Sequence, residues 1–137
     1  MEKVYIDTNI FLNVILYDVE KDQEAKKAHA FLQKVTNNEV SGTTAVLTWD
    51  EFVWVIMQQL GRDIAIEKGN EFLLFPNVSF ENITFNTIIK AQDLISKYNI
   101  HPRDAIHSAS ALEHNVSIIV SFDDDFDIIK ELTRREP

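Results

Sequence analysis

The segment that most constrains the fold is residues 116–122, which read Val-Ser-Ile-Ile-Val-Ser-Phe. This is a nearly continuous run of apolar and β-branched residues, followed directly by acidic residues. Such runs are typical of strands that are buried on both faces of a parallel sheet. Parallel strands need long crossover connections, which are usually helices. The rest of the chain is therefore expected to alternate between strands and helices.

The remaining sequence supplies this alternation. β-prone segments at residues 4–6, 40–46 and 77–83 are separated by stretches with apolar residues at helical spacing. Helices are expected directly after residue 7, over residues 23–35, 48–60, 64–75 and 85–98, from residue 102 onward and briefly over 128–132, with a short edge strand at 133–136. The pattern predicts an α/β fold, a three-layer α/β/α sandwich with a central parallel sheet of four to five strands and helices on both faces.

Composition limits the class of protein. A chain of 137 residues with 45% hydrophobic residues fits one domain, expected to span residues 1–137. The absence of cysteine excludes disulfides and thiolate metal sites. No signal-peptide pattern and no apolar run of membrane-spanning length is present, so we expect a soluble, cytoplasmic protein without a membrane partner.

The charge balance argues against one class of function and favours another. Asp and Glu number 22 against 13 Lys and Arg, a formal net charge of −9. A general nucleic-acid-binding protein usually carries excess positive charge. Hard divalent cations, in contrast, bind to carboxylate oxygens.

Several acidic residues are expected at one edge of the sheet. Asp7 follows the first expected strand and Asp123 follows the last long one, while Glu51 and Asp104 lie in the first turns of expected helices. The carboxyl ends of parallel strands meet at one edge, where ligands gather in open α/β sheets. Clustered carboxylates repel one another, and one or two Mg²⁺ or Mn²⁺ ions would relieve that repulsion and activate water for phosphodiester hydrolysis.

Glu51 has a competing structural role. Thr48 is a natural N-cap, and Glu51 falls three residues later, as in a capping box. The neighbouring Asp50 is an alternative to Glu51 as the residue that points inward. In the last acidic stretch, Asp125 is an alternative to Asp123 or shares its role, and Asp124 is expected to face solvent.

Two further features have alternative interpretations. His107 lies one turn after Asp104 on the same helix face, where it is either a general base or a supporting residue. We favour the supporting role, because a metal site would already activate water. Trp49, Phe52 and Trp54 cannot all face the same way on a helix. At least one is expected to be exposed, which would suit a protein-binding groove.

Four motifs, taken in order, resemble those of the PIN-domain nucleases. They are Ile-Asp-Thr-Asn at 6–9, Thr-x-x-Glu-Phe at 48–52, Arg-Asp-Ala-Ile-His-Ser-Ala at 103–109 and Ser-Phe-Asp-Asp-Asp-Phe-Asp at 121–127. In length and layout the chain most resembles the toxin ribonucleases of the VapC type. The match runs from residue 3 to about residue 132, and the second motif is the least specific.

This resemblance implies a PIN-like fold and a Mg²⁺- or Mn²⁺-dependent ribonuclease that hydrolyses RNA phosphodiester bonds. It implies a metal-binding quartet formed by Asp7, Glu51, Asp104 and Asp123. Thr8 or Asn9 would orient the first carboxylate or a water, and Ser121 would brace the fourth motif. Arg103, beside Asp104, is the first candidate for contact with an RNA phosphate, an ordinary surface arginine being the alternative.

The resemblance also implies partners, namely a second copy of the chain in a homodimer and a small VapB-type antitoxin whose C-terminal segment lies across the active-site groove. Two alternatives stay open: a PIN ribonuclease of RNA processing or decay without an antitoxin, and a non-catalytic PIN-like interaction module. A Mg²⁺-dependent phosphatase is disfavoured, because it would need a second aspartate at position 9, which is Asn9.

Overall fold

Five parallel strands form the central sheet of the computed structural model, which describes all residues from 1 to 137. The strands are β1 (Lys3–Ile6), β2 (Ser41–Ala45), β3 (Val78–Glu81), β4 (Ile118–Val120) and β5 (Thr133–Arg135). Their order across the sheet is β3-β2-β1-β4-β5, so β1 is central and pairs with both β2 and β4. The expected parallel sheet of four to five strands is confirmed, including the short edge strand near the C-terminus.

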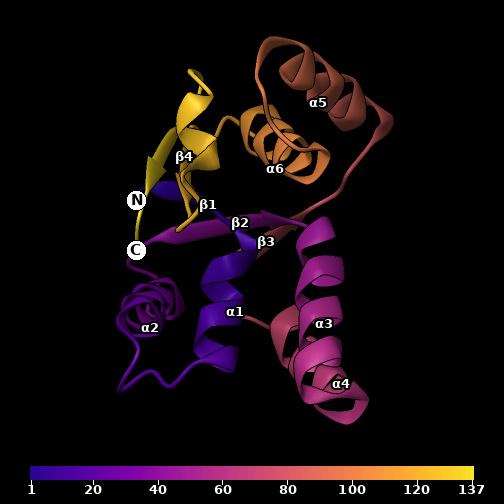
Figure 1. Cartoon of the computed structure of the whole chain (residues 1–137). Helices are drawn as coiled ribbons and strands as arrows, with labels where there is room; N and C mark the ends of the chain where they lie inside the picture. The colour runs from indigo at the N-terminus through magenta and orange to yellow at the C-terminus, as the bar shows by residue number, and fades with distance from the viewer.

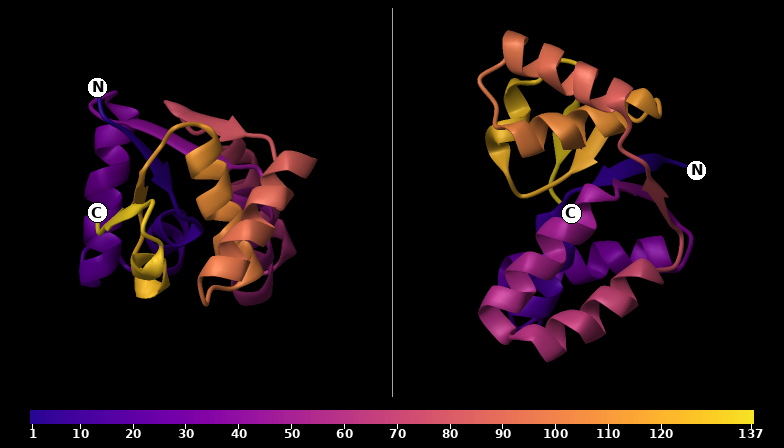
Figure 2. Two further views of the ribbon diagram at one scale, coloured as in Figure 1. Left: turned by 90° about the horizontal axis from the view of Figure 1, so that it is seen from above. Right: turned by 90° about the vertical axis from the view of Figure 1, so that its right-hand side faces the viewer.

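Six helices cover the two faces of this sheet. They are α1 (Thr8–Leu16), α2 (Gln23–Thr36), α3 (Leu47–Leu60), α4 (Arg62–Leu73), α5 (Phe85–Lys97) and α6 (Pro102–Glu113). Helices α1 to α4 lie on one face, and α5 and α6 lie on the other (Figures 1 and 2). The three-layer α/β/α arrangement is thus confirmed. None of these helices combines the length and apolarity that crossing a bilayer would need.

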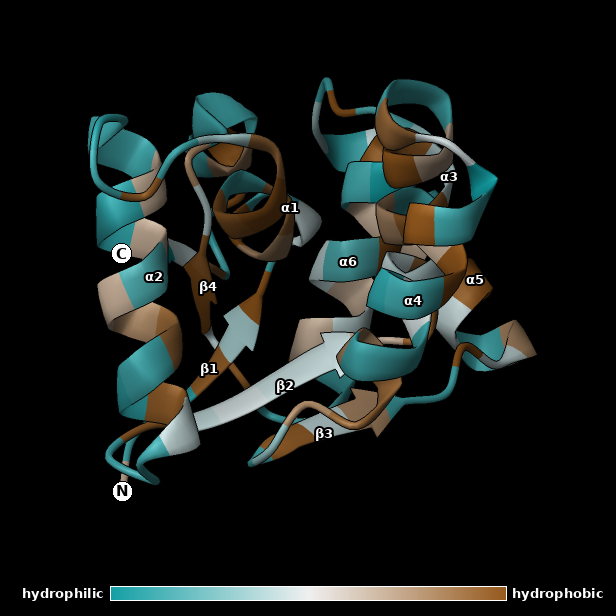
Figure 3. Cartoon of the chain, turned by 90° about the horizontal axis from the view of Figure 1, so that it is seen from below, coloured by the Kyte–Doolittle hydropathy of each residue, from teal (hydrophilic) through white to brown (hydrophobic).

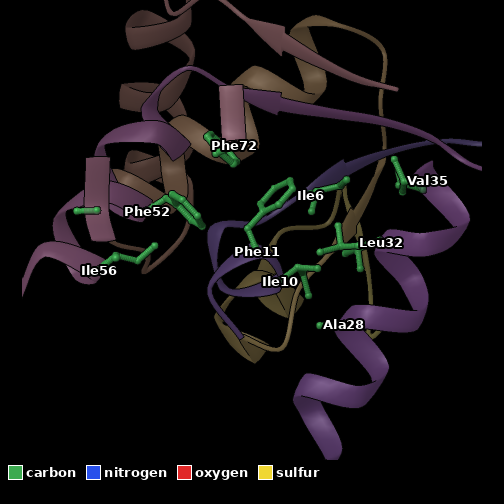
Figure 4. Close-up of a cluster of buried hydrophobic side chains, with 12 residues drawn as sticks. Ile6, Ile10, Phe11, Ala28, Leu32, Val35, Phe52, Ile56 and Phe72 are labelled. Carbon is green, nitrogen blue, oxygen red and sulfur yellow. The ribbon is translucent and has the colours of Figure 1, made fainter. Parts of the chain in front are cut away.

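The central strand contributes to a separate core on each face, because successive side chains of a strand point to opposite sides. Val4 and Ile6 pack with α1 to α4 (Figure 4 labels Ile6), whereas Tyr5 packs with α5 and α6. In β4, Val120 and Ile119 divide in the same way. Figure 3 shows β4 as hydrophobic, as expected for a strand between two helical layers.

Aromatic packing holds α4 against its neighbours. The Phe72 ring lies 5.0 Å from the ring of Phe11 in α1, 4.7 Å from that of Phe52 in α3 and 5.2 Å from that of Phe80 in β3, measured between centroids. Phe52 is therefore the buried member of the aromatic cluster in α3. Trp49 and Trp54 are 43% and 52% exposed, so the expectation that at least one aromatic residue faces outward is confirmed.

The prediction of a helix at residues 128–132 is wrong. A short 3₁₀ helix, η1 (Asp124–Ile128), begins earlier and is capped by Asp123, whose side chain accepts a hydrogen bond from the Asp125 N–H. Ile129 already has an extended backbone, because β5 begins at Thr133 and leaves too few residues for a further helix. Apolar residues there serve the core: Ile129 is 1% exposed.

The predicted capping box at the start of α3 is also wrong. The helix begins at Leu47, and its N-cap, Val46, makes no side-chain capping bond. The Thr48 hydroxyl is instead buried against the Thr44 hydroxyl of β2, 2.7 Å away. The Thr48 hydroxyl is thus bonded to a residue four positions earlier in the chain, and Glu51 has no capping role.

The junction between α3 and α4 depends on one glycine. Gly61 has φ of 94° and ψ of 168°, a conformation essentially restricted to glycine. We expect Gly61→Ala to lower the free energy of unfolding by about 1–3 kcal/mol through backbone strain alone, since open space surrounds the position of the added Cβ. Urea denaturation would measure this, and a loss below about 0.5 kcal/mol would show that the junction adapts without strain.

Candidate active site

Asp7 lies at the carboxyl end of the central strand, and both of its carboxylate oxygens have fixed partners. Its N–H donates to the Val120 carbonyl of β4, which continues the sheet by one bond. Its Oδ1 accepts from the Thr8 N–H at 2.8 Å, which makes Asp7 the N-cap of α1. Its Oδ2 accepts from the Ser121 hydroxyl at 2.6 Å. The side chain is thus held rigidly at this edge.

Ser121 joins Asp7 to the acidic segment that follows β4. Besides donating to Asp7, its Oγ accepts from the Asp123 N–H at 2.9 Å and from Asn9 Nδ2 at 3.2 Å. Asn9 Oδ1 in turn accepts from the Phe122 N–H. The structure therefore places Asn9 and Ser121 between the first and last motifs, where each can fix the position of a neighbouring carboxylate.

Three carboxylates converge beside Asp7. One oxygen from each of Asp104, Asp123 and Asp125 lies within 4.8 Å of the other two. Asp104 comes from the first turn of α6, and the other two come from the segment after β4. Burial, together with the charges of Asp123 and Asp7, raises the pKa of Asp104 to about 6. The sequence placed these acids at one edge, and the structure brings them within reach of one ion.

Glu51, rather than Asp50, is turned inwards, towards His107 and Asp7, and both Glu51 and Asp7 lie outside the group formed by Asp104, Asp123 and Asp125. Its Oε1 accepts from the Thr8 hydroxyl at 2.8 Å and from His107 Nε2. Burial would raise the pKa of Glu51, but hydrogen bonds from His107 and Thr8 lower it overall. Asp50 lies at the surface, 4.0 Å from the Arg103 guanidinium. Glu51 is therefore charged, and the Thr8 hydroxyl and the His107 ring fix the orientation of its carboxylate.

Asp7 and His107 share this environment. Burial is the largest influence on Asp7 and raises its pKa, while His107 and the donors from Ser121 and Thr8 partly offset that rise. Burial opposes a charge on His107, yet Tyr5 and the carboxylates of Glu51 and Asp7 raise its pKa well above the usual value. The His107 ring is thus buried beside Asp7 and Glu51, in a position suited to a supporting residue.

Sequence reasoning missed Tyr5. Its hydroxyl is completely buried, accepts from the Ala45 N–H at 3.0 Å and is bonded to His107 Nδ1. The only signal was a hydroxyl-bearing residue in a buried strand, which needs a partner. Of the remaining candidates, Arg103 is exposed at the rim with its side chain 59% accessible, and Asp124 faces solvent as expected.

The sequence and the fold of this chain are similar to those of several known proteins. The chain is 29% identical to "Ribonuclease VapC2" of Methanocaldococcus jannaschii, over 90% of this chain and 87% of that protein. Its fold is similar to that of VapC20 of Mycobacterium tuberculosis, described as a sarcin-ricin loop cleaving toxin (TM-score 0.79, 15% identity, 98% of this chain and 99% of the other). It is also similar to a chain of VapBC2 from Rickettsia felis, solved bound to a promoter DNA fragment (TM-score 0.75, 14% identity, 98% of each chain). The model of the PIN domain matches residues 4–132, and the chain therefore belongs to the PIN domain family.

Proposed function

We propose that this protein is a Mg²⁺- or Mn²⁺-dependent endoribonuclease. The observation that carries the proposal is the convergence of Asp104, Asp123 and Asp125 beside the buried Asp7. Membership of the PIN domain family and the likeness to a ribonuclease over most of both chains support the choice of RNA as substrate.

The donor set fits a hard divalent cation. Every candidate ligand is a carboxylate, and neither cysteine nor an accessible histidine is among them. Oxygen donors of this kind favour Mg²⁺ or Mn²⁺ over Zn²⁺ or Cu²⁺. The pKa of Asp104, raised to about 6 by burial and by its acidic neighbours, marks a repulsion that a bound cation would relieve.

The acidic residues would bind the metal, and their neighbours would orient them. Asp7, Asp104 and Asp123 would hold one or two ions, with Glu51 and Asp125 completing the set. When bound, such an ion supplies an activated water and neutralises charge on the phosphate. Ser121 and the Thr8 backbone N–H keep the Asp7 oxygens in place.

Substrate binding must overcome an overall charge of −9, which repels a polyanion. Arg103 is exposed at the rim beside Asp104, and its guanidinium suits bidentate contact with a phosphate. We propose single-stranded or loop RNA as the substrate, because its bases can be splayed out of a helix for binding.

The biological role we propose is that of a VapC-type toxin with a small antitoxin partner. The similar structures include VapBC complexes and a "Toxin-antitoxin complex from Klebsiella pneumoniae". Trp49 and Trp54 expose large aromatic surfaces on α3, as protein-docking faces do. We further propose a homodimer, and that both proteins act in the cytoplasm.

Cleavage of a mixed RNA pool, with the cut sites mapped, tests the enzymatic proposal. We expect defined cuts with Mn²⁺, none after addition of EDTA, and recovery when Mn²⁺ is restored. Single-stranded DNA of matched sequence is the control for substrate class. Absence of cleavage with Mn²⁺ by folded protein would indicate a non-catalytic interaction module, and undiminished cleavage in EDTA would contradict the metal requirement.

A further inference from the structure

A buried chain of hydrogen bonds runs from the backbone of β2 to the carboxylate of Glu51. The Ala45 N–H donates to the Tyr5 hydroxyl at 3.0 Å, the Tyr5 hydroxyl is bonded to His107 Nδ1, and His107 Nε2 is bonded to Glu51 Oε1. Tyr5 is 0% and His107 is 1% exposed, so both side chains and the bonds between them are shielded from water. The chain connects residues of β2, β1, α6 and α3.

We propose that His107, oriented by Tyr5, is a positioning residue that holds the Glu51 carboxylate in the orientation needed to bind a metal ion. The inference rests on the proposed metal-dependent function. His107 and the Thr8 hydroxyl both bond to Oε1 of Glu51, whereas Oε2 makes no hydrogen bond within the protein. The free oxygen is the one available to an ion or to a water.

The direction of the hydrogen bonds supports this role. Because the Tyr5 oxygen accepts from the Ala45 N–H, its own hydrogen is available for His107 Nδ1. The proton of a neutral His107 ring then lies on Nε2 and is donated to Glu51. A charged ring carries a proton on Nε2 as well. Glu51 therefore receives the same donor in both protonation states of His107.

Loss of His107 would leave Glu51 with Thr8 as its only side-chain donor. The carboxylate would then rotate about its side-chain torsions and present its free oxygen in many directions. Residues that orient metal ligands in this way are typically worth about 10–100-fold in metal affinity or activity. We expect a loss of that size in Mn²⁺ affinity for His107→Leu.

A conservative variant separates positioning from packing. The side-chain amide of His107→Gln has a donor close to the place of Nε2, so we expect it to regain most of the Mn²⁺ affinity lost in His107→Leu. Tyr5→Phe keeps the imidazole but removes the bond that orients it, and its affinity should lie between those of wild type and His107→Leu. Titration calorimetry with Mn²⁺ alone measures all three without reference to activity.

His114→Leu is the matched control. His114 follows the last residue of α6, where its ring is bonded to the Ser110 carbonyl and to Glu81 Oε2, 3.0 Å away. This variant also loses a histidine–glutamate pair, but one at the opposite end of α6 from the acidic cluster. We expect a lower Tm and an unchanged Mn²⁺ affinity.

The outcomes distinguish this inference from the proposed function. Wild-type Mn²⁺ affinity in folded His107→Leu, or an equal loss in His114→Leu, overturns the positioning role while leaving the ribonuclease intact. If His107→Leu does not fold, Tyr5→Phe decides. Wild-type Mn²⁺ affinity in Tyr5→Phe overturns the inference. Failure of wild-type protein both to bind Mn²⁺ and to cleave RNA overturns the proposed function, and this inference with it.

Discussion

Replacing Asp104 with asparagine is expected to stabilise the metal-free protein at pH 7 while removing its response to Mn²⁺. At that pH the Asp104 carboxylate is ionised, although burial and the charges of Asp123 and Asp7 raise its pKa to about 6. Asp104→Asn removes this repulsion at little change in volume. We therefore expect a higher Tm in EDTA for the variant than for wild type.

The pH dependence follows from the sign of the shift. The pKa of Asp104 is about 6 in the folded state and near its ordinary value of 3.8 in the unfolded chain. Between these two values the folded state binds more protons, so the contribution of Asp104 to stability falls as pH rises from about 4 to about 6. Wild type should lose stability relative to Asp104→Asn over that window, and the two should converge near pH 4.

Mn²⁺ should reverse the order of stability. A ligand at one hundred times its dissociation constant stabilises a folded protein by about 2.7 kcal/mol. Wild type should gain this stabilisation, and Asp104→Asn should lose most of it with one of the ligands. Differential scanning fluorimetry of both proteins in EDTA and in Mn²⁺, at pH 5 and at pH 7, measures the Tm values that this comparison needs.

Asp63→Asn is the control for Asp104→Asn, because Asp63 also lies in the first turn of a helix but outside the acidic cluster. It should lower Tm slightly through loss of a favourable interaction with the helix dipole, and it should leave the Mn²⁺ response unchanged. Equal Tm values for wild type and Asp104→Asn at pH 7 in EDTA would contradict the repulsion. A full Mn²⁺ shift in Asp104→Asn would contradict its role as a ligand.

Asp7→Asn is expected to reduce Mn²⁺-dependent RNA cleavage by about a thousandfold with the fold intact. Several kcal/mol of transition-state stabilisation depend on a correctly held ion, and each 1.36 kcal/mol is a factor of ten in rate. An asparagine at this position still accepts from the Thr8 N–H as an N-cap, which keeps the start of α1 in place. Single-turnover cleavage rates measure the loss.

Asp22→Asn is the matched control for this variant. Asp22 is the N-cap of α2 and accepts from the Ala25 N–H, as Asp7 accepts from the first residue of α1. The same chemical change at a cap outside the acidic cluster should leave the cleavage rate unchanged. Activity of Asp7→Asn within tenfold of wild type would remove Asp7 from the catalytic site.

The alternation of strands and helices was predictable because hydrophobic periodicity records it locally. The same reasoning placed Asp7 and Asp123 at one edge, since parallel strands end there together. The five-stranded sheet and its two helical layers agree with that prediction. Elements that depend on local hydrophobic periodicity could therefore be predicted from the sequence.

Interactions between distant segments were not predictable in this way. Glu51 has the spacing of a capping-box residue, but it bonds instead to Thr8 of α1 and His107 of α6. Tyr5 and His107 are 102 residues apart in sequence, and only the packing of α6 against the sheet brings them together. Where local and tertiary partners compete for the same side chain, the sequence pattern alone therefore does not predict which contact forms.

Anomalous diffraction from crystals soaked in Mn²⁺, at a concentration that supports RNA cleavage, tests the proposed metal site directly. We expect an anomalous peak at about 2 Å from a carboxylate oxygen of Asp7 and from a carboxylate oxygen of at least one of Asp104, Asp123 and Asp125. A peak held by other residues, or none at the carboxyl edge of the sheet, would contradict the proposed site.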